Sequence, residues 1–316
     1  MTVKKRKWYK KILFASLLFF LLFNFVAIMQ AYKLTHFYEH GTVQPMEEQA
    51  NGFWGKTKVA LLGLKQEKLV GTLPDSVYTN VKLKTASGLT LAAWFIHVPH
   101  AKGTVALFHG LGSEKSANLS QSNFFNEMGY STLLVDFRAH GQSEGNTCTI
   151  GYREAEDVKL AYDYLKNNGE NNIILYGISL GAATVTKAIA DYHLTPAKVI
   201  LEMPFASLPK TVEGKMRMAG LPAEPIASIL TFWGGILNGF WAFNMQPKDF
   251  VKAIQCPVLL QWGKKDKGVT EAEINEIFKN ITEPKQLVVY ENSGHENLYE
   301  NEPEKWEEKV EEFLEK

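Results

Sequence analysis

The chain has 316 residues, of which 46% are hydrophobic and 22% are charged, an ordinary balance for a folded protein. Residues 1–31 hold six Lys or Arg and no acidic residue, so the rest has 28 basic against 34 acidic residues, a net charge of −6. This acidic body argues against nucleic-acid binding, which needs a basic face. Cys148 and Cys256 fit no zinc or CxxC spacing, so we expect free thiols, no metal and no cofactor.

The N-terminus is a basic tail, residues 1–11, followed by an apolar run, Ile12–Ala31. A helix of that length spans roughly 30 Å, the thickness of a bilayer core. The charge before the run predicts a cytoplasmic tail, a single-pass anchor in the cell membrane and an extracytoplasmic main domain. Two alternatives stay open: a buried or interfacial helix, and a cleaved signal, for which Met29-Gln30-Ala31 is a poor cleavage site.

Beyond the run, we expect a connector over residues 32–75 and a main domain over residues 76–316. Short apolar runs alternate there with helical patterns, which predicts the α/β class with a doubly wound, mostly parallel sheet covered on both faces. Residues 203–252 break this alternation and are expected to form an inserted helical lid. The expected strands are Val77–Lys84, Leu91–Val98, Val105–Phe108, Thr132–Val135, Ile173–Tyr176, Val199–Leu201, Val258–Trp262 and Leu287–Tyr290. The expected helices are Lys56–Lys68, Gln121–Met128, Glu154–Lys166, Leu180–Tyr192, Glu271–Phe278 and Pro303–Leu314.

The segment Gly177-Ile178-Ser179-Leu180-Gly181 joins an expected strand to an expected helix. A sharp strand-to-helix turn lifts a serine hydroxyl out of the sheet edge, and glycines two residues before and after it remove side chains that would clash. The helix N-terminus also brings a positive dipole end to a developing oxyanion. This context predicts that Ser179 is a catalytic nucleophile rather than part of a structural turn.

Two further polar residues follow expected strands. Asp266 comes just past Val258–Trp262, and His295 comes just past the last strand. Carboxyl ends of parallel strands meet at one edge of a sheet, and the order serine, acid, histidine is that of a known type of catalytic triad. We therefore predict His295 as the base and Asp266 as the acid that orients it. Glu202 also ends a strand and is an alternative acid.

The oxyanion of such a reaction needs backbone N–H donors. Leu180, directly after the serine, is one candidate, and Leu111 in the loop His109-Gly110-Leu111-Gly112 is the other. We expect His109 to be structural and to pack under this loop. The loop Asp136–Gly145 is expected to shape the site and to take no chemical part.

Together these segments resemble the α/β-hydrolase superfamily, most closely its serine-aminopeptidase-like branch of esterases, lipases and thioesterases. The resemblance runs from Val77 to Leu314, and it implies the triad Ser179, Asp266 and His295 with oxyanion donors at Leu111 and Leu180. The segment Gly181-Ala182-Ala183 departs from many lipases of this branch, which have two adjacent glycines there. The residues that carry the resemblance are His109-Gly110, Asp136–Gly145, Gly177–Gly181, Gly263–Asp266 and Gly294-His295.

The expected lid is rich in aromatic residues, among them Phe232, Trp233, Phe240 and Trp241. They are candidate substrate-binding residues for an acyl chain or another apolar group. The other interpretation is that these side chains pack the lid onto the main domain.

The sequence therefore predicts a membrane-anchored serine hydrolase that cleaves carboxylic esters or thioesters through an acyl-enzyme. Its partners would be a small-molecule ester or acyl substrate and the lipid bilayer. A peptidase with the same triad is an alternative, although no charged patch for a peptide terminus is visible. A non-catalytic membrane-bound binding protein is a further alternative, which the intact triad disfavours.

Overall fold

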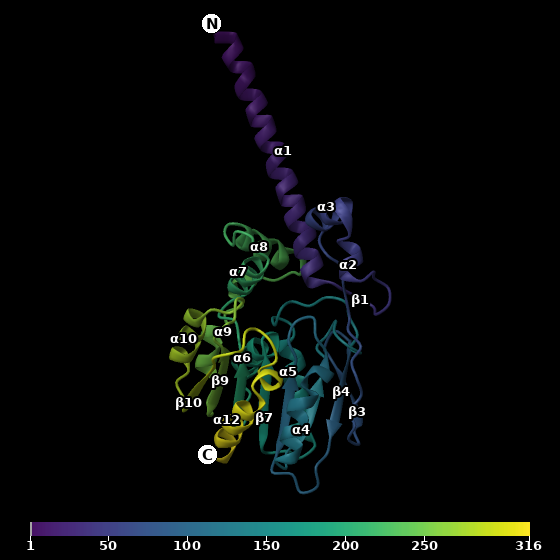
Figure 1. Cartoon of the computed structure of the whole chain (residues 1–316), viewed down its shortest axis with the longest axis vertical. Coiled ribbons are helices and arrows are strands. Elements are labelled where there is room, and N and C mark those ends of the chain that lie inside the picture. The colour runs from purple at the N-terminus through teal and green to yellow at the C-terminus, as the bar shows by residue number, and fades with distance from the viewer. Residues whose placement is uncertain (1) are drawn as a thin grey trace.

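The computed structural model describes residues 2–316, apart from the side chains of residues 2–7 and of Met46. The side chains of four basic residues of the predicted tail are therefore not described: Lys4, Lys5, Arg6 and Lys7. Two parts are visible in Figure 1: a compact α/β body and the long helix α1 (Thr2–Thr35), which projects away from it.

An eight-stranded sheet forms the centre of the body, with strand order β10-β9-β8-β7-β5-β6-β4-β3. The six strands from β10 to β6 are parallel to one another, and β4 pairs antiparallel with both of its neighbours, β6 and β3. Every residue of β5, β6 and β9 is buried, so both faces of the sheet are covered, because successive side chains point to opposite faces. The strands are β3 (Thr79–Lys84), β4 (Thr90–Ile96), β5 (Thr104–Phe108), β6 (Ser131–Val135), β7 (Ile173–Ile178), β8 (Lys198–Glu202), β9 (Val258–Gly263) and β10 (Lys285–Tyr290).

The helices alternate with these strands, which confirms the predicted α/β fold. Most predicted elements begin and end within two residues of the observed ones. After α1 the helices are α2 (Met46–Gln49), α3 (Gly52–Leu62), α4 (Leu119–Glu127), α5 (Ala155–Asn167), α6 (Leu180–Tyr192), α7 (Leu208–Met218), α8 (Ile226–Leu237), α9 (Pro247–Phe250), α10 (Glu271–Asn280), α11 (Leu298–Asn301) and α12 (Pro303–Glu315), with short 3-10 turns at Lys115–Asn118, Ala242–Asn244 and Val251–Ala253.

The helix predicted over Lys56–Lys68 is misplaced, because α3 begins at Gly52 and ends at Leu62. Gly63 follows with a φ of +79°, a conformation that stops the helix and that a side chain would disfavour. The next residues, Gln66–Glu67 (β2), pair in parallel with Phe37–Tyr38 (β1). The segment after the apolar run is thus folded against the end of α1.

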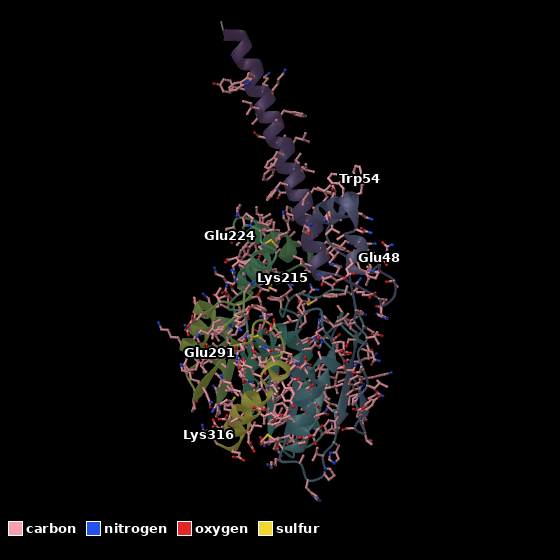
Figure 2. All side chains as sticks on the ribbon, in the orientation of Figure 1. Glu48, Trp54, Lys215, Glu224, Glu291 and Lys316 are labelled. Atoms are coloured by element: carbon pink, nitrogen blue, oxygen red, sulfur yellow. The ribbon has the colours of Figure 1, made fainter. Side chains whose placement is uncertain are left out.

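Helix α1 has two differently surrounded parts. From Trp8 to Phe25 its side chains are exposed or partly exposed, whereas Ala27 and Ala31 are buried against the body. The exposed part stands free of the body in Figure 2. The C-terminal part of α1 packs against α3 and α8. Gln30 Nε2 donates there to Val59 O (2.9 Å), and Trp233 Nε1 donates to Oδ1 of the partly exposed Asn24 (2.9 Å), near the end of the exposed part.

Candidate active site

Ser179 lies on the sharp turn between β7 and α6, with φ of 51° and ψ of −106°, a conformation that a non-glycine residue rarely adopts. The flanking glycines are needed because the backbones are in contact. A Cβ at Gly177 would come within 2.4 Å of Gly181 C, and one at Gly181 within 2.2 Å of Phe108 O. The turn therefore presents the serine hydroxyl above the carboxyl end of β7.

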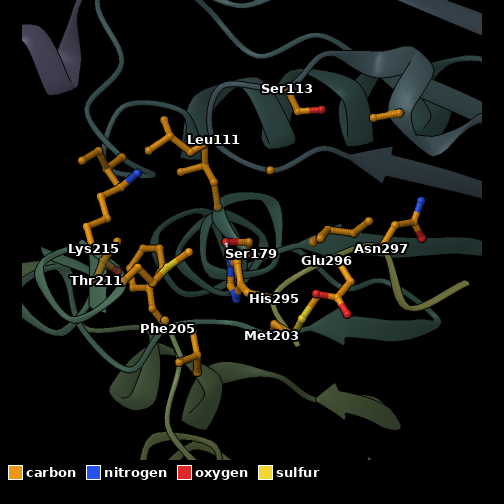
Figure 3. A pocket seen from close by; sticks show the side chains of 18 of the residues that line it. Leu111, Ser113, Ser179, Met203, Phe205, Thr211, Lys215, His295, Glu296 and Asn297 are labelled. Carbon is orange, nitrogen blue, oxygen red and sulfur yellow. Dashed lines mark hydrogen bonds between the residues drawn. The ribbon is translucent and has the colours of Figure 1, made fainter. Parts of the chain in front are cut away.

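The structure brings the three predicted triad residues into one hydrogen-bonded chain, of which Figure 3 shows Ser179 and His295. Ser179 Oγ lies 2.9 Å from His295 Nε2, and His295 Nδ1 lies 2.6 Å from Asp266 Oδ2. The other oxygen, Oδ1, accepts the N–H groups of Gly268 (2.7 Å) and Val269 (2.8 Å). With the carboxylate fixed in this way, His295 Nδ1 carries the proton and Nε2 is free to accept from the serine hydroxyl.

Glu202, the alternative acid, is directed elsewhere. It is fully buried and accepts hydrogen bonds from Tyr176 Oη (2.7 Å), Trp306 Nε1 (2.5 Å) and Gln261 Nε2 (3.2 Å). Loss of water raises the pKa of this carboxyl from 4.5 to about 7. Because His295 Nδ1 bonds to Asp266, the geometry favours Asp266 as the acid.

The two predicted oxyanion donors, Leu111 and Leu180, both line the cavity beside Ser179. Two buried histidines hold the loop that carries Leu111. His109 Nδ1 donates to Gly110 O (2.7 Å) and its Nε2 accepts from Phe137 N (3.2 Å), while His140 Nε2 accepts from Gly112 N (3.2 Å).

Burial lowers the pKa of each of these histidines to about 4, so both rings are neutral at physiological pH and can accept a hydrogen bond. The loop Asp136–Gly145 is fixed by Asp136, which accepts from Lys115 N (2.7 Å) and Gln142 N (2.8 Å) and pairs with the Lys115 ammonium. These contacts agree with the predictions that His109 has a structural role and that the loop Asp136–Gly145 shapes the site. The hydrogen bond from the Gly112 N–H group to His140 was not predicted, because no sequence pattern indicates that these two residues are in contact.

A cavity of about 360 Å³ opens beside Ser179 and His295. One wall comes from the expected lid, where Phe205, Thr211 and Lys215 face the cavity. Thr211 and Lys215 belong to helix α7, which was not predicted as a separate element. A signal was present, since Ser207 caps this helix and Pro209 lies in its first turn.

None of the candidate substrate-binding residues Phe232, Trp233, Phe240 and Trp241 lines this cavity, and their contacts agree better with the other interpretation, that they pack the lid. The Trp233 indole bonds to Asn24 of α1, and Phe240 stacks on Tyr152 with 4.4 Å between ring centroids. Phe232 and Trp241 are 38% and 51% exposed. Phe232 and Trp233 of α8, and Phe240 and Trp241 beyond its end, thus lie against α1, against Tyr152 or at the surface, whereas Thr211 and Lys215 of α7 line the site.

Comparisons with known proteins agree with this geometry. A family described as serine aminopeptidase, S33, matches residues 99–232, which include the Ser179 turn. The chain is 26% identical to an uncharacterized protein, YqkD, of Bacillus subtilis over 73% of this chain and 77% of that protein. It is 25% identical to a carboxylesterase of the same bacterium over 67% of this chain and 92% of the relative.

Among solved structures, an esterase of Pyrococcus furiosus is similar, with a TM-score of 0.67 and 25% identity over 79% of this chain and 96% of the esterase. An esterase from Exiguobacterium antarcticum, 19% identical with a TM-score of 0.58, covers 75% of this chain over its own full length and shares the fold. The sheet order, the serine turn and these similarities together establish that the chain belongs to the α/β-hydrolase superfamily, with a match to the serine aminopeptidase family over residues 99–232 and with esterase relatives.

Proposed function

We propose that the protein is a serine esterase that cleaves carboxylic esters through an acyl-enzyme on Ser179. The observation that carries this proposal is the hydrogen-bonded chain from Ser179 through His295 to Asp266, which opens into a cavity. A serine hydroxyl is a weak nucleophile until an adjacent base takes its proton. The esterases among the similar proteins support an ester as the substrate.

In the first half of the reaction, Ser179 Oγ attacks the ester carbonyl carbon while its proton passes to His295 Nε2. The carbonyl oxygen becomes an oxyanion, which the N–H groups of Leu111 and Leu180 stabilise. His295 then donates the proton to the departing alcohol, and the acyl group stays on Ser179. In the second half, His295 deprotonates a water molecule that attacks the acyl-enzyme, which releases the carboxylic acid and restores the serine.

Thioesters and peptides are alternatives that use the same steps. The family match favours the peptide alternative, because its description is that of an aminopeptidase. A panel of p-nitrophenyl esters, acyl thioesters and aminoacyl p-nitroanilides separates the three classes. We expect kcat/KM to be largest for the esters. Turnover of the aminoacyl anilides alone would contradict the proposal.

We further propose that α1 anchors the protein in the cell membrane, with the body outside the cytoplasm. The exposed stretch from Trp8 to Phe25 has 18 residues, about 27 Å of helix, close to the thickness of a bilayer core. Aromatic residues flank it, as they do at membrane interfaces: Trp8 and Tyr9 lie at one end, and Phe53 and Trp54 of α3 are 75% and 79% exposed near the other.

Two experiments test the anchor. Alkaline carbonate extraction should leave the protein in the membrane pellet, and protease added from the non-cytoplasmic side should digest the body but spare residues 1–11. A soluble mature chain that begins near Tyr32 would identify α1 as a cleaved signal. A body that resists external protease would reverse the orientation.

A further inference from the structure

The catalytic cavity contains a lysine that no part of the proposed mechanism uses. Lys215, on α7, lines the cavity together with Ser179. Among the residues that the structure describes, no hydrogen-bond acceptor, carboxylate or aromatic ring is paired with its ammonium group. In Figure 3 its side chain extends from α7 along the cavity wall on the side where Leu111 lies.

Other basic residues of α7 are engaged. Lys210 Nζ bonds to Glu213 Oε2 (2.8 Å), and Arg217 Nη2 bonds to Gly268 O (2.7 Å). The acid within the cavity, Glu296, accepts from Gly294 N (2.8 Å) and lies on the other side of Ser179 in this view. The cavity therefore has a positive end, at Lys215, that no acidic side chain of the described chain neutralises.

An ammonium group that is partly buried without an acceptor is unfavourable, because the charge loses water without gaining a partner. Lys215 is only partly exposed, Phe205 and Met218 are among the apolar residues that line the same cavity, and burial lowers the pKa of the Lys215 ammonium below its usual value of 10.5. A ligand with a negatively charged oxygen would restore the lost interaction.

We propose that Lys215 forms an anion-binding subsite, and that the preferred substrates are esters that also carry a carboxylate or phosphate group. This inference rests on the proposed esterase function. It assigns Lys215 to the charged oxygens of the substrate. The ammonium and a carboxylate or phosphate form a charge-assisted hydrogen bond, the stronger kind in proteins.

Matched substrate pairs test the subsite with the full chain in detergent. The first pair places the charge on the acyl side, with p-nitrophenyl valerate against mono-p-nitrophenyl glutarate. The second places it on the alcohol side, with 1-lauroylglycerol against 1-lauroylglycerol 3-phosphate. The quantity measured is the ratio of kcat/KM for the charged member to that for the neutral one, which does not depend on how much enzyme is folded.

We expect Lys215→Gln to lower this ratio by about tenfold to a hundredfold for at least one pair, since hydrogen bonds to charged groups have that strength. Lys215→Arg should keep most of the wild-type ratio. The matched control is Lys210→Gln, on the exposed side of the same helix, which should leave the ratio unchanged. An unchanged ratio for both pairs in Lys215→Gln would overturn the subsite.

A binding measurement separates this inference from the esterase proposal. The Ser179→Ala protein holds substrate without turning it over, so titration of tryptophan fluorescence gives its affinity for each lauroyl compound. We expect the phosphate-bearing member to bind at least about tenfold more tightly, and the Ser179→Ala/Lys215→Gln protein to lose that preference. Equal affinities for both members and in both proteins would refute the subsite, whatever the catalytic assays give.

Discussion

The carboxyl edge of the sheet and the unit formed by α1 and α8 are held together in different ways. At the sheet edge, Ser179, His295 and Asp266 are joined by short hydrogen bonds between loops that each follow a strand. The helix pair is held mainly by apolar packing, with single hydrogen bonds such as that from Trp233 to Asn24. In our proposals, the first region performs the chemistry and the second determines where in the cell the chemistry takes place.

The largest effect should follow from Ser179→Ala. This change removes the only atom that forms the acyl-enzyme and leaves the packing of α1 and α8 untouched. Loss of the nucleophile of such a triad lowers kcat by on the order of 10⁶. Turnover of a p-nitrophenyl ester measures it, and a thermal midpoint equal to that of the wild type controls for folding. Residual activity within tenfold of the wild type would show that the nucleophile lies elsewhere.

The next largest effect should come from Asp266→Asn. An amide at this position favours the wrong His295 tautomer, which lowers kcat by on the order of 10⁴ without unfolding the protein. Glu202→Gln is the matched control, because Glu202 also ends a strand but contacts Tyr176 and Trp306. A crippled Glu202→Gln beside a nearly normal Asp266→Asn would reverse our assignment of the acid.

Glu202 should instead act on stability. Its carboxyl pKa is raised from 4.5 in the unfolded chain to about 7 in the folded one. The native state therefore holds the proton more tightly, and stability present at low pH is lost as the pH rises from about 4.5 to 7. The loss is roughly 3 kcal/mol for this shift.

Urea unfolding of the wild type and of Glu202→Gln at several pH values tests this shift. Since the other titrating groups are shared, the difference in unfolding free energy between the two proteins should move in favour of the variant as the pH rises. A difference that does not change with pH would mean that the carboxyl is charged at no cost in the native state.

The smallest effect concerns the α1–α8 contact. Trp233→Phe and Asn24→Leu each remove one partner of the hydrogen bond between the two helices. A double-mutant cycle of these changes, measured by thermal unfolding in detergent, should give a coupling energy of about 1 kcal/mol. No coupling would mean that the hydrogen bond does not stabilise the lid against the anchor.

The sheet edge could be predicted from the sequence, whereas the contacts between α1 and α8 could not. Strands such as β5 and β9 are buried on both faces, and the close backbone contacts of the turn around Ser179 require glycine at positions 177 and 181, so local patterns were sufficient there. The aromatic residues of α8 carry no such restriction. The same amphipathic pattern suits a pocket wall or a helix contact, and the contact of Trp233 with Asn24 joins residues 209 positions apart.

The roles of Lys215 and His140 escaped prediction for a related reason. Each role depends on a neighbour that is distant in sequence. Lys215 faces the cavity that Ser179 also lines, and His140 accepts a hydrogen bond from the Gly112 N–H group. A lysine on an amphipathic helix is usually solvated, and a glycine-rich loop shows no partner in its own sequence. Such roles become visible only when the sheet edge and the lid are brought together.

Trapping of the acyl-enzyme tests the central claim most directly. The purified chain would be mixed with a p-nitrophenyl ester, quenched in acid during the initial burst, digested and sequenced by mass spectrometry. We predict one acyl group per chain, on Ser179, together with an equimolar burst of p-nitrophenol and no adduct in Ser179→Ala. An acyl group on another residue, or steady turnover of the Ser179→Ala protein, would contradict the account.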